Sequence, residues 1–503
     1  MTRSRCALTI LAERCWRNWF LSFPLSPGRG ADIVTDIPAR LDRLPWRRFH
    51  WLVVGALGIT WILDGLEVTF IGAVSGVLQE PATLGLSSSA IGLLASFYLA
   101  GAIVGALVFG YLTDRFGRKR LFTVTLGVYL IGVLLSAFSW NLWSFAAFRF
   151  LTGAGIGGEY GAINSAVDEL IPARLRGRVD LAINGSYWLG AALGAGATVV
   201  LLNPALLPVD VGWRIGFGAG AAIGLIVLLL RRFLPESPRW LLTHGYPARA
   251  EAIVAAIERR CGESVSVQPA ETLALHPRRR VGLRVVFATL FGPYRTRTML
   301  GLALMIAQAF LYNAIFFTYA LVLTNFYAVP PAATGLYLLP FALGNFLGPL
   351  VLGPLFDTVG RRPMIAGTYI ISALLLAVTG ALFANGMLSA TAQTAAWTII
   401  FFFASAAASA AYLTVSEIFP LEIRARAIAV FYALGTAVGG LLAPWLFGAL
   451  IGTGSRVAVF AGYLVAAVLM LIAAGVEFRW GVRAEQRSLE AVAAPLSIYS
   501  RTK

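Results

Sequence analysis

Residues 110–120 read GYLTDRFGRKR, and residues 353–363 read GPLFDTVGRRP. The two stretches align at an offset of 243, with Asp114 opposite Asp357. A second pair, ELIPARLR (169–176) and EIFPLEIR (417–424), shares the pattern E-x-x-P-x-x-x-R at an offset of 248. Two different motifs that recur at nearly the same offset predict that the chain is a duplicated unit.

The composition around these motifs is typical of a membrane protein. Of the 503 residues, 58% are hydrophobic and 13% are charged, and the mean hydropathy is +0.77. Apolar stretches of roughly 20 residues, the length that crosses a bilayer core of about 30 Å, recur along the chain. We predict twelve membrane-spanning helices, at 52–76, 90–112, 121–139, 142–166, 180–202, 214–233, 299–325, 333–355, 364–386, 393–415, 427–450 and 456–477.

The repeated motifs follow predicted helices two and eight, and four and ten, so each half of the chain has six helices. We therefore expect an all-α membrane protein built from two six-helix pseudo-repeat bundles. The linker contains PARAEAIVAAIERR (247–260), which predicts a helix outside the membrane. The expected parts are an extension at 1–50 that is disordered to about residue 33, bundles at 51–233 and 298–478, a linker at 234–297 and a tail at 479–503.

The net charge of +16 is interpreted as a topology signal. The loops predicted on one side hold nearly all of the 40 Lys and Arg residues, whereas the opposite loops hold only Arg214 and Arg456. By the positive-inside rule, both termini and the linker are expected in the cytoplasm, with the chain in a plasma membrane, the inner membrane if the cell is bacterial. Nucleic acid is not an expected partner. The three Cys and three His residues lie outside the predicted spans, so no disulfide, metal site or cofactor is expected.

Several motifs carry a family resemblance. GYLTDRFGRKR resembles the loop that follows helix two in the major facilitator superfamily, and FRFLTGAGIGGEYGA (148–162) resembles its Arg- and Gly-rich helix four motif. PESPRWLL (235–242) and SEIFPLEIRA (416–425) resemble the sugar porter branch, and DGLE (64–67) resembles the helix one motif of proton symporters for aromatic and other organic acids. The resemblance covers about residues 45–480 and implies a secondary transporter that works by alternating access.

Three departures from the sugar porter pattern argue against a hexose substrate. AQAFLYN (307–313) has Ala307 in place of the first Gln, Ala408, Ser409 and Tyr412 replace the G-P-x-x-W motif, and VEFRWGVR (476–483) replaces the P-E-T-K-G tail. The closer resemblance is to the metabolite–proton symporters. We expect proton-coupled symport of a small polar organic metabolite, with an organic acid favoured. A sugar or polyol porter, a metabolite or drug exporter, and a nutrient sensor that does not transport are alternatives.

Two acids in the first predicted helix, Asp64 and Glu67, lie one turn apart in an apolar run. An ionisable group deep in a span is costly unless it is paired or neutralised. At 1.5 Å per residue, Asp64 lies about 18 Å from the inner face and Arg149 about 10 Å from the outer face, so their depths nearly coincide. We predict that Arg149 pairs with Asp64, and that Asp64, Glu67 and Arg149 form the proton-coupling site.

Charged residues of the two repeated motifs are predicted to form a cytoplasmic gate, since family resemblance implies that they make ion pairs and cap helix ends. This set is Asp114, Arg118, Glu169, Arg176, Asp357, Arg361, Glu417 and Arg424. Substrate contacts are predicted for polar side chains within the spans, because amides and phenols both donate and accept hydrogen bonds. These are Glu159, Gln308, Tyr312, Asn313, Tyr319, Asn345 and Tyr412. Gln308, Tyr312 and Tyr319 are expected on one helical face.

The small residues of the fourth predicted helix, Gly153, Gly155, Gly157 and Gly158, predict a close helix–helix contact. No nucleophile–base pair, nucleotide site or metal cluster is apparent in a span, so an enzyme is not expected. The expected partners are a small-molecule substrate, protons and the lipid bilayer, and we expect the chain to work as a monomer.

Overall fold

The structure is a computed structural model that describes residues 32–231, 234–262, 272–275, 281–316, 318–330 and 334–497. The predicted disorder of the N-terminal extension falls almost wholly on residues outside these ranges. From Asp32 onward the extension is described, and it contains a short strand and a helix.

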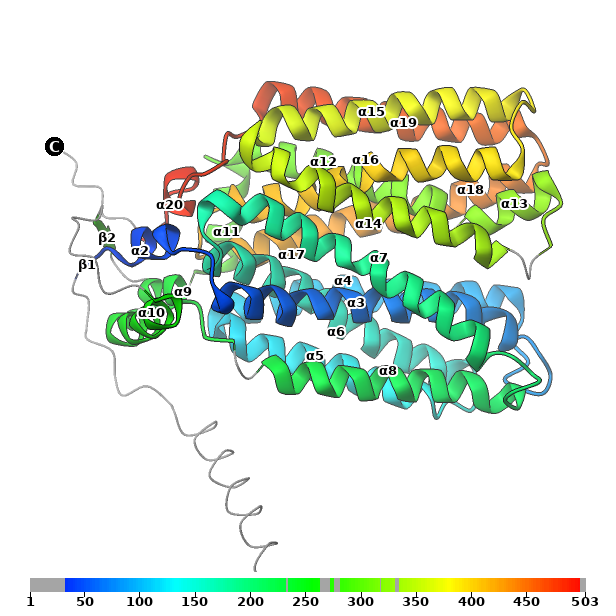
Figure 1. Ribbon diagram of the computed structural model, residues 1–503, viewed down its shortest axis with the longest axis horizontal. Helices are drawn as coiled ribbons and strands as arrows, with labels where there is room; N and C mark the ends of the chain where they lie inside the picture. The colour runs from blue at the N-terminus through cyan, green and yellow to red at the C-terminus, as the bar shows by residue number, and fades with distance from the viewer. Residues whose placement is uncertain are drawn as a thin grey trace, which may run out of the picture.

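Long helices make up nearly all of the structure (Figure 1). The first part of the chain forms β1 (Ile33–Thr35), α2 (Ile37–Arg43), α3 (Arg48–Val77), α4 (Ser88–Phe116), α5 (Arg118–Ser136), α6 (Leu142–Leu170), η1 (Ala173–Leu175), α7 (Arg176–Leu201), α8 (Val209–Arg231), α9 (Pro238–Thr243), α10 (Pro247–Cys261) and β2 (Leu273–Leu275). The second part forms α11 (Leu283–Phe291), α12 (Arg295–Phe316), α13 (Tyr319–Tyr327), α14 (Thr334–Thr358), α15 (Arg361–Ala384), α16 (Ala390–Glu417), α17 (Arg424–Gly435), the π-helical η3 (Thr436–Leu441), α18 (Leu442–Gly452), α19 (Arg456–Trp480) and α20 (Leu489–Val492).

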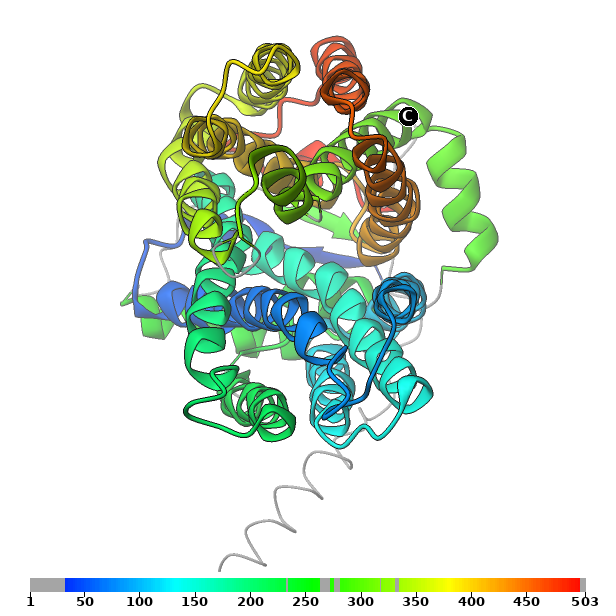
Figure 2. The same cartoon turned by 90° about the vertical axis from the view of Figure 1, so that its right-hand side faces the viewer.

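The long helices lie in two groups that face each other across the middle of the molecule. The end-on view shows α3–α8 below and α12–α19 above (Figure 2). We call them the N-bundle and the C-bundle. The two groups are the two copies that the repeated motifs predict, since α4 and α14 precede the first pair of motifs and α6 and α16 precede the second.

Ten helices in the described part of the chain are long and apolar enough to cross a membrane. The other two of the twelve predicted spans correspond to α6 and α7, which run the length of the N-bundle beside their neighbours (Figure 1). Both helices carry buried charged side chains, among them Arg149, Glu159 and Asp180. Polar residues are tolerated there because these surfaces face protein rather than lipid.

Two predicted spans are interrupted in the structure. The stretch predicted as one helix at 299–325 is split into α12 and α13, and the stretch at 427–450 changes from α17 through η3 to α18. Single π-helical turns inside long helices are frequently found at functional sites. Both interruptions lie in the C-bundle on helices that border the central cavity described below.

Several helices begin at a side chain that caps their first backbone N–H groups. The Ser87, Ser389 and Ser455 hydroxyls accept hydrogen bonds from the third residues of α4, α16 and α19, and Asn141 forms a capping box with Ser144 at the start of α6. Such caps satisfy donors that a helix start would leave unpaired. They explain why these helices begin where they do.

One end of the bundle carries α2, α9, α10 and α20, and we call it the basic end because the Arg-rich loops lie there (Figure 1). The predicted helix at 247–260 is confirmed as α10. β1 pairs antiparallel with β2, so the N-terminal segment is hydrogen-bonded to the linker. The extension, linker and tail therefore meet at the same end of the molecule.

The glycines of α6 allow α4 to approach closely, as the sequence predicted. A Cβ atom on Gly153 would lie 2.1 Å from the Tyr98 carbonyl oxygen, and one on Gly157 would lie 2.0 Å from that of Ala102. Side chains at these positions would separate the two backbones, because real Cβ contacts are never so short. A Cβ atom on Gly155 would lie 2.4 Å from the Tyr129 backbone nitrogen of α5, and one on Gly158 would lie 2.6 Å from the Phe109 ring of α4.

Candidate functional site

A central cavity lies between the N-bundle and the C-bundle. Nine of its lining side chains are aromatic: Trp61, Tyr98, Tyr160, Tyr187, Trp188, Tyr312, Phe316, Tyr412 and Tyr432. The lining also includes amides and hydroxyls, which are Asn184, Gln308, Asn313, Ser405, Ser409 and Thr436. Among the described residues of this lining, the charged one is Asp64. The cavity therefore combines flat apolar faces with many hydrogen-bonding groups and a carboxylate.

Asp64 is held by two phenols rather than by a cation. The hydroxyl of Tyr160 donates to Asp64 Oδ2 at 2.7 Å, and that of Tyr98 donates to Oδ1 at 3.3 Å. The Asp64 residue is 2% exposed, although it borders the cavity. Tyr98 comes from α4 and Tyr160 from α6, so three helices of the N-bundle define the position of this carboxylate.

The predicted pairing of Arg149 with Asp64 is wrong. The Arg149 guanidinium forms its ion pair with Glu67, one turn further along α3. The rings of Tyr98 and Phe217 flank this guanidinium, with centroids 5.2 Å and 5.6 Å from its central carbon. The two acids of the DGLE motif therefore have different environments: Asp64 faces the cavity, and Glu67 lies behind it with the arginine.

The ion pair of Arg149 and Glu67 is buried and only partly satisfied. Arg149 Nη2 and Glu67 Oε2 have no hydrogen-bond partner among the described residues. A buried charged pair with unpaired atoms is less stable than a fully bonded one, because the missing hydrogen bonds to water are not replaced. This pair can exchange its partners at lower cost than a complete network could.

Glu159 lies outside the lining of the central cavity and makes its own ion pair. Both of its oxygens accept from Arg231 of α8 at 3.0 Å, and Arg231 also donates to Thr60 Oγ1 and the Phe122 carbonyl oxygen. Sequence reasoning did not single out Arg231, although it falls near the end of the predicted helix 214–233. A smaller cavity separates Glu159 from Asp64 and is lined by both of them.

The predicted substrate contacts of the C-bundle divide into two groups. Gln308, Tyr312, Asn313 and Tyr412 line the central cavity. Asn345 lies behind the cavity and accepts a hydrogen bond from the Tyr312 hydroxyl at 2.7 Å, so it positions that phenol. Tyr319 lies on α13, beyond the break in the predicted helix, and its hydroxyl donates to the Tyr337 carbonyl oxygen. The single helical face predicted for Gln308, Tyr312 and Tyr319 is interrupted by this break.

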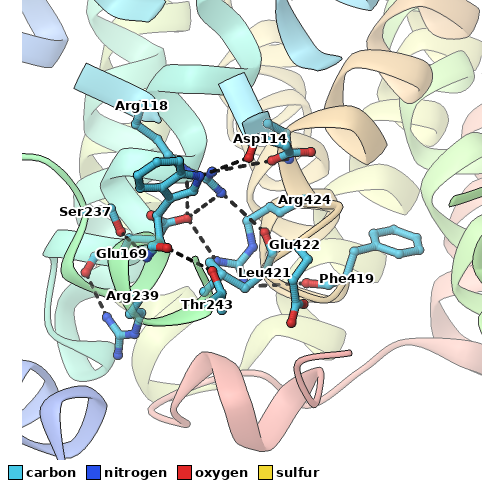
Figure 3. Close-up of polar contacts among 12 residues, drawn as sticks. Asp114, Arg118, Glu169, Ser237, Arg239, Thr243, Phe419, Leu421, Glu422 and Arg424 are labelled. Carbon is cyan, nitrogen blue, oxygen red and sulfur yellow. Dashed lines mark hydrogen bonds and ion pairs between the residues drawn. The ribbon is translucent and has the colours of Figure 1, made fainter. Parts of the chain in front are cut away.

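The eight charged residues predicted as a gate gather at the basic end and form ion pairs in two similar sets. In the N-bundle Arg118 contacts Glu169 at 2.9 Å and Asp114 at 3.5 Å. In the C-bundle Arg361 contacts Glu417 and Asp357, each at 3.0 Å. Two longer ion pairs join the bundles, from Arg424 to Glu169 at 3.7 Å and from Arg176 to Glu417 at 3.5 Å. Figure 3 shows Arg118, Asp114, Glu169 and Arg424 around one of these centres.

The two aspartates make shorter contacts between the bundles than these two ion pairs. The Asp114 carboxylate accepts from the backbone N–H groups of Ala425 and Arg426, at 3.3 Å and 3.1 Å, at the start of α17. The Asp357 carboxylate accepts from those of Gly177 and Arg178, both at 2.9 Å, at the start of α7. Each acid therefore caps a helix of the opposite bundle, where the helix dipole favours negative charge.

Two arginines that complete this arrangement were missed from the sequence. Arg426 Nε lies 2.9 Å from Asp114, and Arg178 Nε lies 3.2 Å from Asp357. The signal was present, because the repeated motif continues as E-x-x-P-x-x-x-R-x-R in both copies, at 169–178 and 417–426. Gly117 and Gly360, which are also equivalent, have φ values of +97° and +118° and form the turns before α5 and α15.

The linker docks on the same end. Glu236 accepts from the Arg118 backbone N–H at 2.9 Å, and Arg239 contacts Asp42, Glu490 and the Glu169 carbonyl oxygen. His244 stacks on Trp240 with ring centroids 4.1 Å apart. Burial lowers the pKa of His244 to about 4, so the ring is neutral at physiological pH.

Two pseudo-symmetric bundles of membrane-spanning helices, a cavity between them and charged contacts that close one end define a membrane transporter. The comparisons with known proteins agree. Residues 56–492 match the family model described as "Sugar (and other) transporter", and the chain belongs to this family. Its fold is that of the major facilitator superfamily. The family consists of transporters, and the protein is a transporter of small molecules rather than an enzyme.

Three similar proteins illustrate the relationship. A niacin transporter of Acinetobacter baylyi is 28% identical over 414 residues, which cover 81% of this chain and 89% of the relative. A 4-hydroxybenzoate transporter of the same species is 26% identical, covering 83% and 88%. The structure of the proton:xylose symporter XylE of Escherichia coli superposes with a TM-score of 0.72 at 19% identity, covering 88% of this chain and 98% of that one. At 19% identity, the similarity to XylE establishes the fold.

Proposed function

We propose that the protein takes up a small organic acid together with a proton, and that an acid with a flat unsaturated ring is preferred. The observation that carries the proposal is the central cavity, where aromatic faces surround a set of amides and hydroxyls beside Asp64. Pockets of this kind hold small molecules by stacking and by a few directed hydrogen bonds.

The lining fits such an acid better than a sugar. Phenols and amides such as Tyr312, Gln308 and Asn313 can donate to a carboxylate, while Trp188 and Phe316 offer faces to a ring. Two of the relatives are named as transporters of niacin and of 4-hydroxybenzoate, which are both aromatic monocarboxylic acids. Asp64 would repel a substrate anion, so binding the anion favours the protonated form of Asp64. Substrate and proton therefore enter the cavity together.

The pair of Glu67 and Arg149 supplies a second proton-sensitive group behind the cavity. Protonation of Glu67 would remove the counterion of Arg149, whose Nη2 already has no partner among the described residues. The freed guanidinium would then attract the substrate carboxylate from behind Tyr98, which lines the cavity and whose ring faces Arg149. In this scheme Asp64, Glu67 and Arg149 couple proton binding to substrate binding.

The ion pairs at the basic end serve as the gate of an alternating-access cycle. With the basic end in the cytoplasm, as the charge distribution predicts, the structure corresponds to a state closed toward the cytoplasm. Opening requires the loss of the contacts that Asp114 and Asp357 make with the opposite bundle. Proton and substrate would enter from the outside and leave on the inside.

Transport by the full chain in proteoliposomes tests the proposal. Radiolabelled nicotinate and 4-hydroxybenzoate are the probes, with xylose as the contrasting substrate. For symport of one anion with one proton, a gradient of one pH unit supports about tenfold accumulation. A protonophore should reduce the internal concentration of the acid to the external one.

Three outcomes would contradict the proposal. Accumulation of xylose without either acid would indicate a sugar porter, for which Gln308 and Asn313 would be the sugar-binding amides. Binding of an acid without flux would indicate a sensor. Uptake that the protonophore does not change would exclude proton coupling.

A further inference from the structure

Tyr160 connects the Asp64 carboxylate to the opposite bundle. Its hydroxyl makes the shorter of the two hydrogen bonds to Asp64, 2.7 Å against 3.3 Å from Tyr98. Its ring stacks on two rings of the C-bundle, with centroids 4.5 Å from Tyr432 and 6.0 Å from Tyr412, at interplanar angles of 30° and 20°. One side chain of the N-bundle therefore contacts both Asp64 and helices α16 and α17.

Tyr98 provides a natural contrast within the same site. It also donates to Asp64, but its ring faces the Arg149 guanidinium of its own bundle. The two phenols thus share a chemical role toward Asp64 and differ in what their rings contact. Of the ring contacts described for these two phenols, those of Tyr160 join the bundles and would be broken if the bundles moved apart at this level.

Tyr160 also lies between two cavities. It lines the central cavity together with Tyr412 and Tyr432, and it lines the smaller cavity together with Asp64 and Glu159. The smaller cavity extends from Asp64 toward the basic end, because its lining residues Thr60 and Ile163 lie nearer to the start of α3 and the end of α6, which are at the basic end. Tyr160 is therefore part of the partition between the central cavity and the basic end.

We propose that Tyr160 is the positioning residue through which the protonation of Asp64 controls closure at the basic end. An ionised Asp64 accepts a charge-assisted hydrogen bond from Tyr160, which holds the ring against Tyr412 and Tyr432 and favours the closed state. A protonated Asp64 is a weaker acceptor, so the ring is released and the bundles can separate. This inference rests on the proposed use of Asp64 as a proton site, and it adds how that proton acts on the conformation.

The neighbouring groups are compatible with this role. The groups that face Asp64 from the packed elements are Glu67 on α3, Tyr98 on α4, Arg149, Glu159 and Tyr160 on α6, Tyr187 on α7, Arg231 on α8 behind Glu159, Tyr412 on α16 and Tyr432 on α17. The two arginines of this set are bonded to Glu67 and Glu159, so Asp64 has no cation of its own among the described residues. Its hydrogen bonds therefore respond directly to its protonation.

The test measures conformation without any substrate. Spin labels are placed on Phe116→Cys and Val359→Cys, two exposed positions at the basic end of the N-bundle and the C-bundle, in a full-length background with Cys6, Cys15 and Cys261 replaced. Distance distributions between the labels report the ratio of closed to open molecules. In the otherwise unaltered protein we expect this ratio to fall about tenfold as the pH is lowered through the titration of Asp64.

Three variants separate the roles. Tyr160→Phe keeps the ring and removes the hydroxyl, and we expect it to abolish the pH dependence of the ratio. Tyr98→Phe also removes one donor to Asp64, but it should preserve the pH dependence and move only its midpoint. Tyr327→Phe removes the hydroxyl of a tyrosine that lines neither cavity and bonds Gln393 at 3.2 Å, and it should behave like the unaltered protein.

The proposal is overturned if Tyr160→Phe keeps the full pH dependence, if Tyr98→Phe abolishes it equally, or if the unaltered protein shows none. Asp64→Asn should abolish the dependence as well, and a dependence that survives in this variant would place the controlling proton on another group. Failure of proton-coupled uptake in proteoliposomes is a separate observation, because it concerns the substrate and flux rather than the closure. The two proposals can therefore fail independently.

Discussion

The contacts of Asp357 with α7 allow the energy of closure at the basic end to be estimated. This carboxylate caps α7 through the N–H groups of Gly177 and Arg178, both at 2.9 Å, and contacts Arg178 Nε at 3.2 Å. All three contacts join the two bundles, so they exist only in the closed state. The pair with Arg361 lies within the C-bundle, so separation of the bundles does not break it. Loss of the Arg361 pair in a variant therefore affects closed and open molecules equally and does not change the ratio between them.

In Asp357→Asn the remaining oxygen can still accept one backbone N–H, while the charge is lost. Loss of one charge-assisted hydrogen bond costs about 1.5 kcal/mol. Loss of the favourable charge at the helix start adds about 0.5 kcal/mol. The pair with Arg178 adds little, because the Arg178 side chain is 40% exposed. The total of about 2 kcal/mol predicts that the ratio of closed to open molecules falls about 30-fold.

The spin labels at Phe116→Cys and Val359→Cys measure this ratio. Asp210→Asn is the matched control, because Asp210 forms an exposed i,i+4 pair with Arg214 at the far end of the molecule. It should leave the distance distribution unchanged. A closed population in Asp357→Asn equal to that of the control would refute the reasoning that the helix cap holds the bundles together.

Three further predictions follow from local contacts. Glu67→Gln leaves the buried Arg149 without its counterion, so proton-driven accumulation of the acid should fall at least about tenfold. Exchange of labelled for unlabelled acid should persist. Equal loss of accumulation and exchange in transport assays would instead indicate misfolding. Gly105→Ala places a Cβ atom 2.0 Å from the Ala154 carbonyl oxygen, so it should lower the free energy of unfolding by about 1–3 kcal/mol in thermal melts in detergent. Gly127→Ala is the control, because a Cβ atom at Gly127 meets no atom within 4 Å and should not change this free energy. Because burial lowers the pKa of His244 to about 4, the undocked linker binds a proton more readily than the docked one. The free energy of docking therefore becomes less favourable as the pH falls below about 6.5, by about 2 kcal/mol at pH 5. Below about pH 4 this loss stays constant, because the histidine is then protonated in both forms. Limited proteolysis of α9 and α10 at each pH, compared with His244→Phe, should show this loss only in the chain that retains the histidine.

Much of the architecture could be predicted from the sequence because it depends on properties that repeat along the chain. Apolar stretches of the right length located the helices, and the two copies of each motif located the halves. The residues predicted as a gate could be grouped as ion-pairing partners from the sequence, since Arg118, Glu169 and their equivalents recur at matching positions and pair in the structure. Their division between contacts within a bundle and contacts across the bundles was not predictable, because Arg118 and Arg424 have the same side chain and both contact Glu169, the first from within the N-bundle and the second from the C-bundle.

The candidate site was less predictable because its residues are brought together by helix packing. The aromatic lining comes from α3, α4, α6, α7, α12, α16 and α17, and aromatic residues are too common in membrane helices for their positions to stand out. Tyr160 and Tyr432 illustrate this point. They are 272 positions apart in the sequence, and nothing in either segment indicates that their rings stack.

By itself, the sequence determined that this protein is a duplicated bundle of membrane helices with two acids on the first helix and a repeated charged motif in each half. Tertiary structure decided which acid meets Arg149. Asp64 and Glu67 are three residues apart, about 4.5 Å along the helix, so an error of two or three residues in one helix end reverses the choice. Gly65 and Gly190 let α3 and α7 approach closely, and Gly153 and Gly157 do the same for α6 and α4. This packing sets the tilt and rotation of the helices, so that Glu67 lies beside the arginine and Asp64 faces the cavity and Tyr160.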